Sequence, residues 1–188
     1  MFHLNPKNNE LAKRFWILLP IENASSLFFY KPKTKSTRII LQIKYMQKWS
    51  FAQYLGRVFA NEAKDYDFFD GIDAIVPIPL TKEREAERGY NQSLHFALGI
   101  KEITGIPVVK DAVSRVSFNG SQTRKSKFER RDNVKGAFKL ASSASIKDKH
   151  VLIVDDVITT GSTILSCAEE LLKGGVKSIS VASIGYTK

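Results

Sequence analysis

The sequence predicts an α/β fold with a central parallel β-sheet flanked by helices, and three observations lead to this fold class. Short apolar runs rich in β-branched residues alternate with longer segments of helical periodicity. The apolar runs are nearly continuous, as expected of strands buried on both faces. The 188 residues are 43% hydrophobic and 26% charged, which is typical of one folded domain. Ligands bind such sheets beyond the carboxyl ends of the strands, so a functional site is expected there.

Four short apolar runs are the predicted strands, and the first of them ends in prolines. They lie at residues 73–79 (DAIVPIP), 108–113, 151–157 and 178–184. Three segments with apolar residues at helical spacing are the predicted helices, at residues 49–64, 91–103 and 163–173. The last helix is followed by Gly174 and Gly175, which suit a helix C-terminus. Strand and helix thus alternate along the chain, as the fold class requires.

The formal net charge of +10 predicts an anionic partner. Charge alone leaves a polyphosphate substrate, nucleic acid and an acidic protein open. No apolar run approaches the roughly 20 residues of a membrane-spanning helix, and the first residues lack the apolar core of a secretory signal. We therefore expect a cytoplasmic protein without membrane insertion. The single cysteine, Cys167, can form neither an internal disulfide nor a cysteine-rich zinc site.

The most informative segment is VLIVDDVITTGST, residues 151–163. Two adjacent carboxylates, Asp155 and Asp156, follow a buried strand, where leaving them unpaired would cost several kcal/mol. The two hydroxyls of a sugar diol can each donate to one carboxylate, with a hydrated Mg²⁺ relieving the repulsion between them. The following hydroxyl-rich turn opens a helix, whose exposed N–H groups and dipole favour an anion. A diol site and a phosphate site are thus expected side by side.

Four other interpretations of this segment can be compared with the sequence. A P-loop needs GxxxxGK[ST] and a dinucleotide fold needs GxGxxG, and neither string occurs. A response-regulator receiver also has an acidic first strand end, but only 32 residues follow Asp156, too few for the βαβ units of that domain, which take about 30 residues each. Simple capping of a helix by the acidic residues does not explain the hydroxyl-rich turn.

The segment VLIVDDVITTGST resembles the phosphoribosyl-pyrophosphate signature of type I phosphoribosyltransferases. Residues 76–93, VPIPLTKEREAERGYNQS, resemble the competence protein ComF family within that fold, and further matches are Gln122, Arg130, Asn133, Val134, Gly136, Ala137 and Phe138. The resemblance covers roughly residues 28–188 and is strong from Asp73 onward. It implies a phosphoribosyltransferase domain at residues 49–188, preceded by a small hood-like region at residues 1–48. Many ComF-like proteins have a four-cysteine zinc ribbon at the N-terminus, whereas this N-terminus has no cysteine.

The resemblance also implies roles for particular residues. Asp155 and Asp156 are the implied catalytic residues, which hold the ribose hydroxyls, and Mg²⁺ is carried by the donor pyrophosphate, with the two aspartates near it through water. Arg84 and Arg88 would reach the pyrophosphate. Residues 115–133 occupy the position of the mobile loop that closes over the site, and Arg130 within it is either a substrate contact or a scaffold residue. The residues implied to hold the 5-phosphate are Thr159, Thr160, Gly161, Ser162 and Thr163.

Two functions remain open at this stage. The first is transfer of phosphoribosyl from phosphoribosyl pyrophosphate to a nitrogen nucleophile, with Mg²⁺. The second, implied by the family name, is a non-enzymatic role in DNA uptake through single-stranded DNA or a competence helicase partner. Residues 28–49 combine aromatic and basic side chains, as single-strand binders do, although aromatics in the core and lysines in water would give the same composition. The acceptor and the oligomeric state, including a dimer, stay open.

Overall fold

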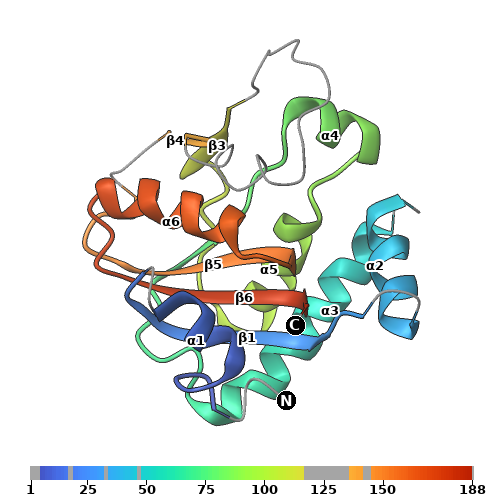
Figure 1. Ribbon diagram of the computed structural model, residues 1–188, viewed down its shortest axis with the longest axis horizontal. Coiled ribbons are helices and arrows are strands. Elements are labelled where there is room, and N and C mark those ends of the chain that lie inside the picture. Colours follow the sequence, from blue (N-terminus) through green and yellow to red (C-terminus); the bar gives the residue numbers. More distant parts are fainter. Residues whose placement is uncertain are drawn as a thin grey trace.

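The computed structural model describes residues 5–16, 19–31, 34–45, 48–116, 136–141 and 145–187. Within them, four parallel strands form one sheet in the order β1-β6-β5-β2 (Figure 1). The strands are β1 (Ile21–Phe29), β2 (Ala74–Pro77), β5 (His150–Ile158) and β6 (Ser178–Tyr186). Val108 adds a parallel bridge to Ile75 beside β2. The predicted fold class, a central parallel sheet flanked by helices, is confirmed.

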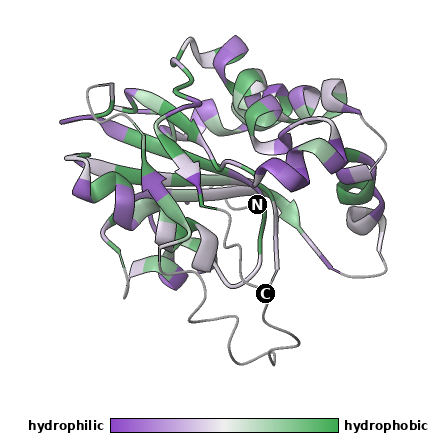
Figure 2. Ribbon diagram, turned by 90° about the horizontal axis from the view of Figure 1, so that it is seen from above, coloured by the Kyte–Doolittle hydropathy of each residue, from purple (hydrophilic) through white to green (hydrophobic). Residues whose placement is uncertain are grey.

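Helices cover both faces of this sheet (Figure 1). Alternate residues of β5 pack on opposite sides, because side chains alternate along a strand. Val151 and Ile153 join one hydrophobic cluster with α1 and α6, whereas Leu152 and Val154 join a second with α2, α3 and α5. Figure 2 shows hydrophobic residues along the sheet and a mixture of hydrophobic and hydrophilic residues along the helices. The helices are α1 (Glu10–Trp16), α2 (Lys35–Tyr45), α3 (Trp49–Ala63), α5 (Gln92–Thr104) and α6 (Ser162–Lys173).

Helices α3 and α5 cross at two glycines. A Cβ atom at Gly99 would lie 2.0 Å from the backbone oxygen of Gln53, and one at Gly56 would lie 2.2 Å from that of Phe96. Neither position therefore has room for a side chain. Beside the crossing, Phe59 and Phe96 pack with ring centroids 5.6 Å apart in the core. This tight contact fixes α5, whose first turn reaches the carboxyl end of β5.

The N-terminal part of the chain joins the central sheet directly. Strand β1 pairs in parallel with β6, so that Ser26 lies opposite Ser183 and Phe28 opposite Gly185. Before β1, the side chain of Asn9 accepts hydrogen bonds from the N–H groups of Leu11 and Ala12 (2.9 Å each) and so caps α1. Sequence analysis predicted none of α1, β1 and α2.

Smaller elements complete the fold. Strands β3 (Val113–Arg115) and β4 (Phe138–Leu140) form an antiparallel pair, and α4 (Lys82–Arg88) follows β2. A 3-10 turn, η2 (Lys64–Tyr66), follows α3. The predicted strand at residues 108–113 is wrong: beyond the bridge at Val108 the chain turns at residues 110–111, and β3 begins only at Val113. Among the helices of the described residues, none has the length and apolar character that a membrane span requires.

Candidate functional site

Asp155 lies near the carboxyl end of β5 and is held by two donors. Its Oδ1 accepts hydrogen bonds from the Oγ of Ser93, on the first turn of α5 (3.3 Å), and from the backbone N–H of Asp156 (2.8 Å). Burial, and then the neighbouring charge of Asp156, raise the pKa of Asp155 to about 7. The carboxyl group therefore changes its charge near neutral pH, and a donor or cation placed beside it would favour the ionised form.

Asp156 is compensated by cations from two helices. Its Oδ2 lies 3.2 Å from the Nζ of Lys44 on α2 and 3.8 Å from a guanidinium nitrogen of Arg88 on α4. All three side chains are at least three-quarters buried. The same Arg88 nitrogen donates to Oε1 of Gln92 (2.8 Å), and the Asp156 Oδ1 accepts from the N–H of Val157 (2.6 Å). Asp156 is therefore a shared anchor for elements from three parts of the chain.

The turn from β2 to α5 is pinned at both ends, and this positions α4 and its arginines. The N–H of Ile78 donates to the oxygen of Val154 (2.9 Å), and the side chain of Asn91 donates to the oxygen of Ile78 (3.0 Å). Asn91 also caps α5 by accepting from two backbone N–H groups. Thr81 caps α4, which ends at Gly89 with φ of 77°. Arg88 consequently points back to β5 from the last turn of a capped helix.

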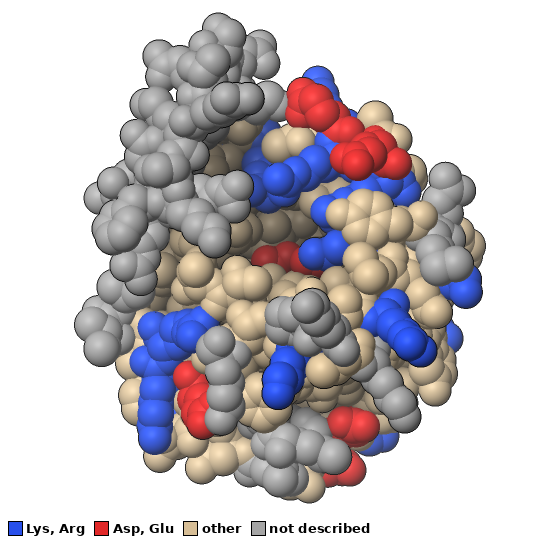
Figure 3. Space-filling model, turned by 45° about the vertical axis from the view of Figure 1, so that its right-hand side comes forward, with Lys and Arg blue, Asp and Glu red and all other residues tan. Residues whose placement is uncertain are grey.

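Arg115 brings a further cation to Asp155. It is the last residue of β3, and its guanidinium carbon lies 5.3 Å from the ring centroid of Phe138. Burial lowers the pKa of Arg115, the positive charge of Arg84 lowers it further, and the negative charge of Asp155 acts in the opposite direction. Arg84, Arg115 and Asp155 thus lie within electrostatic reach of one another. Figure 3 shows, on this face, a hollow with acidic atoms at its base and Lys and Arg side chains around it.

The turn between β5 and α6 packs closely against the ring of Phe15. Gly161 has φ of 83°, which favours glycine, and a Cβ at this position would lie 2.8 Å from the ring of Phe15. The hydroxyls of Thr160 and Ser162 are hydrogen-bonded to each other (2.5 Å). Within the described residues, α6 has no side-chain cap at its N-terminus. Its first N–H groups therefore remain suited to an anion from outside the helix.

Helix α1 supports this turn from the outside. Phe15 is fully buried beneath Gly161. A guanidinium nitrogen of Arg14 donates to the backbone oxygen of Thr159, and the guanidinium carbon lies 4.9 Å from the ring centroid of Tyr186. The N-terminal helix is therefore built into the wall of the site, an arrangement that the sequence pattern did not indicate.

The structure brings most of the predicted site residues to one end of the sheet. Asp155, Asp156 and Arg88 meet directly, the turn at residues 159–163 follows β5, and Arg84 is exposed on the first turn of α4. Arg130, and the family matches at residues 122, 133 and 134, lie outside the described residues.

Three residues contact or approach the acidic pair in a way that the sequence did not predict: Lys44, Ser93 and Arg115. Ser93 closes the GYNQS string of the family match. Lys44 belongs to the basic and aromatic segment at residues 28–49, and Arg115 is the first residue of the segment assigned to the mobile loop, but neither segment indicated a contact with the acidic pair.

The site offers oxygen ligands for a divalent cation but no complete set of them. The carboxylates of Asp155 and Asp156 are of the type that Mg²⁺ prefers. No group of three His, Cys, Asp or Glu side chains in the described part of the chain is arranged to hold a metal ion. A Mg²⁺ ion at this place would therefore need oxygens from a bound ligand and from water.

Comparisons with known proteins show which family the chain resembles. Residues 92–186 match the family model of the phosphoribosyl transferase domain. The chain is 40% identical over 147 residues to the competence protein F of Haemophilus influenzae, covering 76% of this chain and 64% of that protein. It is 32% identical over 146 residues to the DNA utilization protein YhgH of Escherichia coli, covering 76% and 63%. The chain thus spans a little under two thirds of the length of these relatives.

Solved structures show the same fold. The glutamine phosphoribosylpyrophosphate amidotransferase of Bacillus subtilis, complexed with ADP and GMP, has a TM-score of 0.53 at 21% identity, covering 77% of this chain and 30% of that one.

The competence protein ComFC of Bacillus subtilis is a further relative by sequence. It is 34% identical over 109 residues, which are 58% of this chain and 42% of that protein. With the parallel sheet and the domain match, these likenesses establish that the chain belongs to the phosphoribosyl transferase domain family, among the relatives of competence protein F.

Proposed function

We propose that this protein binds phosphoribosyl pyrophosphate with Mg²⁺ and transfers the phosphoribosyl group to a nitrogen nucleophile. The observation that carries the proposal is the order of groups at the end of β5. The carboxylate pair Asp155 and Asp156 is followed at once by a hydroxyl-rich turn at the N-terminus of α6. The spacing suits a ribose 5-phosphate, whose diol is on the ring and whose phosphate is on the carbon attached to it.

In this proposal the two carboxylates accept hydrogen bonds from the ribose hydroxyls. Asp156 already carries two cations, so a diol would replace or share the contact with Lys44 (3.2 Å). Asp155 accepts a long hydrogen bond from Ser93 (3.3 Å), and its pKa is raised by burial and by the charge of Asp156. A hydroxyl donor would favour its ionised form. Thr159, Thr160, Gly161, Ser162 and Thr163 would receive the 5-phosphate.

The pyrophosphate would lie among the cations on the α4 side. Arg84, Arg88 and Arg115 lie on the two elements that flank the acidic pair, α4 and β3. Displacement at the anomeric carbon breaks the carbon–oxygen bond to pyrophosphate, which leaves with the electron pair, while the nucleophile forms the new carbon–nitrogen bond. Guanidinium groups stabilise the charge that develops on the leaving oxygens. Mg²⁺, when bound, would neutralise part of the same charge. Arg130 is proposed as a further contact to the donor.

Calorimetric titration of phosphoribosyl pyrophosphate, with and without Mg²⁺, tests this function. Metal-dependent binding to the parent protein, and its loss in Asp155→Asn with Asp156→Asn, are expected. The matched control is Asp65→Asn with Asp111→Asn, which removes two exposed carboxylates from other parts of the surface. Equal affinities in the parent and in the double variant of the acidic pair would contradict the site. If the protein binds phosphoribosyl pyrophosphate but transfers its phosphoribosyl group to no acceptor in a screen, the site would act as a sensor of the donor and not as an enzyme.

A second candidate function is binding of single-stranded DNA, which the relatives' names, competence protein and DNA utilization protein, suggest. Tyr45 and Trp49, at the end of α2 and the start of α3, are 61% and 51% exposed. Each follows a lysine, Lys44 or Lys48, and exposed aromatics beside cations suit base stacking. Phe28 and Tyr30, by contrast, pack against the core. Loss of oligothymidine binding in Tyr45→Ala with Trp49→Ala, with a steep salt dependence in the parent, would support this role; binding that ignores salt and both substitutions would exclude it.

A further inference from the structure

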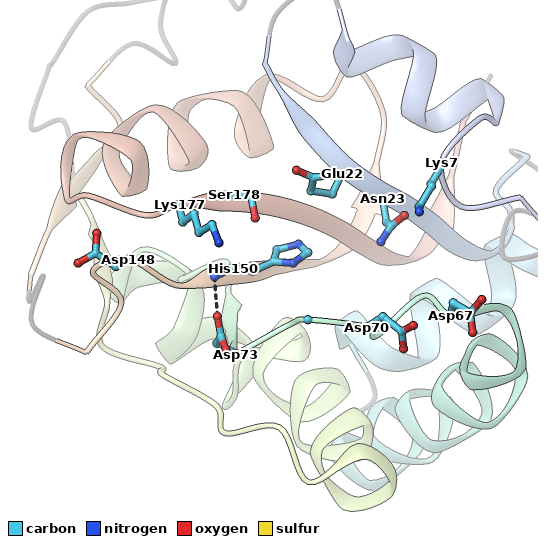
Figure 4. A pocket seen from close by; sticks show the side chains of 11 residues that line it. Lys7, Glu22, Asn23, Asp67, Asp70, Asp73, Asp148, His150, Lys177 and Ser178 are labelled. Carbon is cyan, nitrogen blue, oxygen red and sulfur yellow. Dashed lines mark hydrogen bonds between the residues drawn. The ribbon is translucent and has the colours of Figure 1, made fainter.

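A second pocket opens at the end of the sheet where the parallel strands begin, opposite the candidate phosphoribosyl site (Figure 4). Its volume is about 430 Å³, and its walls come from the starts of β1, β5 and β6 and from residues 67–73, before β2. His150 and the acidic pair occupy the two ends of β5, so about 16 Å of strand separates this pocket from the candidate phosphoribosyl site. It therefore offers a separate place for a ligand.

The charge at this pocket is opposite to that of the whole chain. Five carboxylates and two lysines line it, in a protein of net charge +10. The carboxylates belong to Glu22, Asp67, Asp70, Asp73 and Asp148. Asp73 also accepts a hydrogen bond from the N–H of His150 (2.8 Å), which fixes one side of the pocket. A local excess of three negative charges attracts a cation even where the overall field is positive.

The pocket wall also contains a buried side-chain amide, that of Asn23, whose oxygen accepts no hydrogen bond from the described residues. Asn23 is only 4% exposed, and its Nδ2 makes a long contact to the oxygen of Phe68 (3.5 Å). Its Oδ1 has no hydrogen-bond donor among the residues that the structure describes. Buried acceptors are usually paired, and pairing one here would be favourable by about 1–3 kcal/mol. Figure 4 shows the amide group on the side of the pocket where Glu22 lies.

The imidazole beside this amide is held neutral, so it does not oppose a cation. The Nε2 of His150 is hydrogen-bonded to the Oγ of Ser180 (2.9 Å). Burial lowers the pKa of His150, although the charges of Glu22 and Asp73 act in the opposite direction. The imidazole is therefore uncharged, and the charged side chains of the pocket, the five carboxylates with Lys7 and Lys177, are exposed at its rim.

The spacing of the acidic groups selects among cations. No three of the His, Cys, Asp and Glu side chains in the described residues converge on one point as metal ligands do. The carboxylates are instead distributed around a space large enough for a small organic molecule. Separate carboxylates and a deeper amide acceptor suit a ligand that carries N–H donors at both ends.

We propose that this pocket binds a small organic dication, with one ammonium or guanidinium group against Asn23 and the other against the carboxylates of the rim. Because the pocket shares no residue with the candidate phosphoribosyl site, the proposal stands apart from the proposed function. Each exposed carboxylate contributes about a two- to fivefold change in affinity. The buried amide oxygen, accepting from a charged donor, contributes about tenfold or more.

The test is calorimetric titration of agmatine and of putrescine into the full chain in 150 mM NaCl. Saturable binding at one site per chain is expected, with Mg²⁺ and neutral 1,4-butanediol giving none. Glu22→Gln with Asp70→Asn should weaken binding about tenfold, whereas Asp65→Asn with Asp111→Asn should leave it unchanged. Asn23→Leu should weaken amine binding as well. If that variant does not fold, the comparison of the rim variant, Glu22→Gln with Asp70→Asn, with its control decides the question alone.

Three results would overturn the proposal. The first is no saturable binding of either amine, and the second is Mg²⁺ competing with the amines at equal concentration, which would show general attraction to negative charge. The third is equal weakening in the rim variant and in its control. The double variant of Asp155 and Asp156 should bind agmatine like the parent, and loss of amine binding in it would place the dication at the other end of the sheet.

Discussion

The Nζ of Lys44 lies 3.2 Å from the Oδ2 of Asp156, so a helix near the N-terminus contacts a carboxylate on the central sheet 112 residues later in the chain. The contact closes α2 over the carboxyl end of β5 and gives the site a wall that the central strands do not supply. Four predictions follow from this and from neighbouring contacts.

Lys44→Met should loosen α2. The substitution keeps the length of the side chain but leaves Asp156 with Arg88, at 3.8 Å, as its remaining cation. A partly buried pair of this kind contributes about 1 kcal/mol to stability. We expect faster backbone hydrogen exchange in residues 35–45 and a free energy of unfolding lower by that amount. Lys48→Met, an exposed lysine between α2 and α3, is the control, and equal exchange in both variants would show that the ion pair does not hold the helix.

Asp155→Asn should remove a pH dependence of stability. The folded-state pKa of about 7 lies above the unfolded value near 3.8, so the folded protein holds a proton that the unfolded chain releases. The contribution of Asp155 to the free energy of unfolding is therefore fully present below about pH 4 and is lost as the pH rises towards 7. Chemical denaturation should show no effect of the substitution at pH 4 and a stabilisation of about 1–3 kcal/mol at pH 8. A difference of the same size at both pH values would mean that Asp155 is already ionised in the acidic range.

Gly99→Ala should destabilise the protein, although the same change usually stabilises a helix by about 1 kcal/mol. A Cβ here would lie 2.0 Å from the backbone oxygen of Gln53, so α3 and α5 must separate. Overpacking of a core costs about 1–3 kcal/mol, and backbone shifts can raise this. The midpoint of urea unfolding should therefore fall. Lys101→Ala, exposed on the same helix, should leave the free energy of unfolding within about 0.5 kcal/mol of the parent value.

Gly161→Ala should disturb the turn after β5 in two separable ways. The positive φ of 83° costs an alanine about 1–2 kcal/mol, and the added Cβ would lie 2.8 Å from the ring of Phe15. Phe15→Leu in the same chain relieves the second effect only. A double-mutant cycle of unfolding free energies should thus show that the two substitutions together cost less than their sum. Strict additivity would mean that the ring moves aside freely.

The sequence predicted the class of the fold because its central strands are plainly apolar. Residues 151–157 read as a buried strand, and the structure pairs them with neighbours on both sides. Strand β1 escaped prediction because it is buried with small polar residues. Ser25 and Ser26 are fully buried, and Ser26 accepts a hydrogen bond from Ser183 on β6 (3.1 Å). Such a strand has neither the alternation of apolar and polar residues nor the continuous apolar run by which strands are predicted from sequence.

The candidate site was predictable only within two strings, residues 76–93 and 151–163, that resemble family motifs. The acidic pair and the turn after it form one string, whereas Lys44 and Arg115 reach the pair from α2 and β3. Their positions depend on how α2 folds over the sheet and on the β3–β4 pair, which are long-range features. The GYNQS string showed a family match, but only the structure shows that Asn91 caps α5 and that Ser93 donates to Asp155.

Strand β1 connects two helices that touch the site from opposite faces of the sheet. Before it, α1 supports the turn at Gly161 through Phe15, and after it, α2 reaches Asp156 through Lys44. A fusion partner or epitope tag that strained the amino end of β1 would pull on both supports at once.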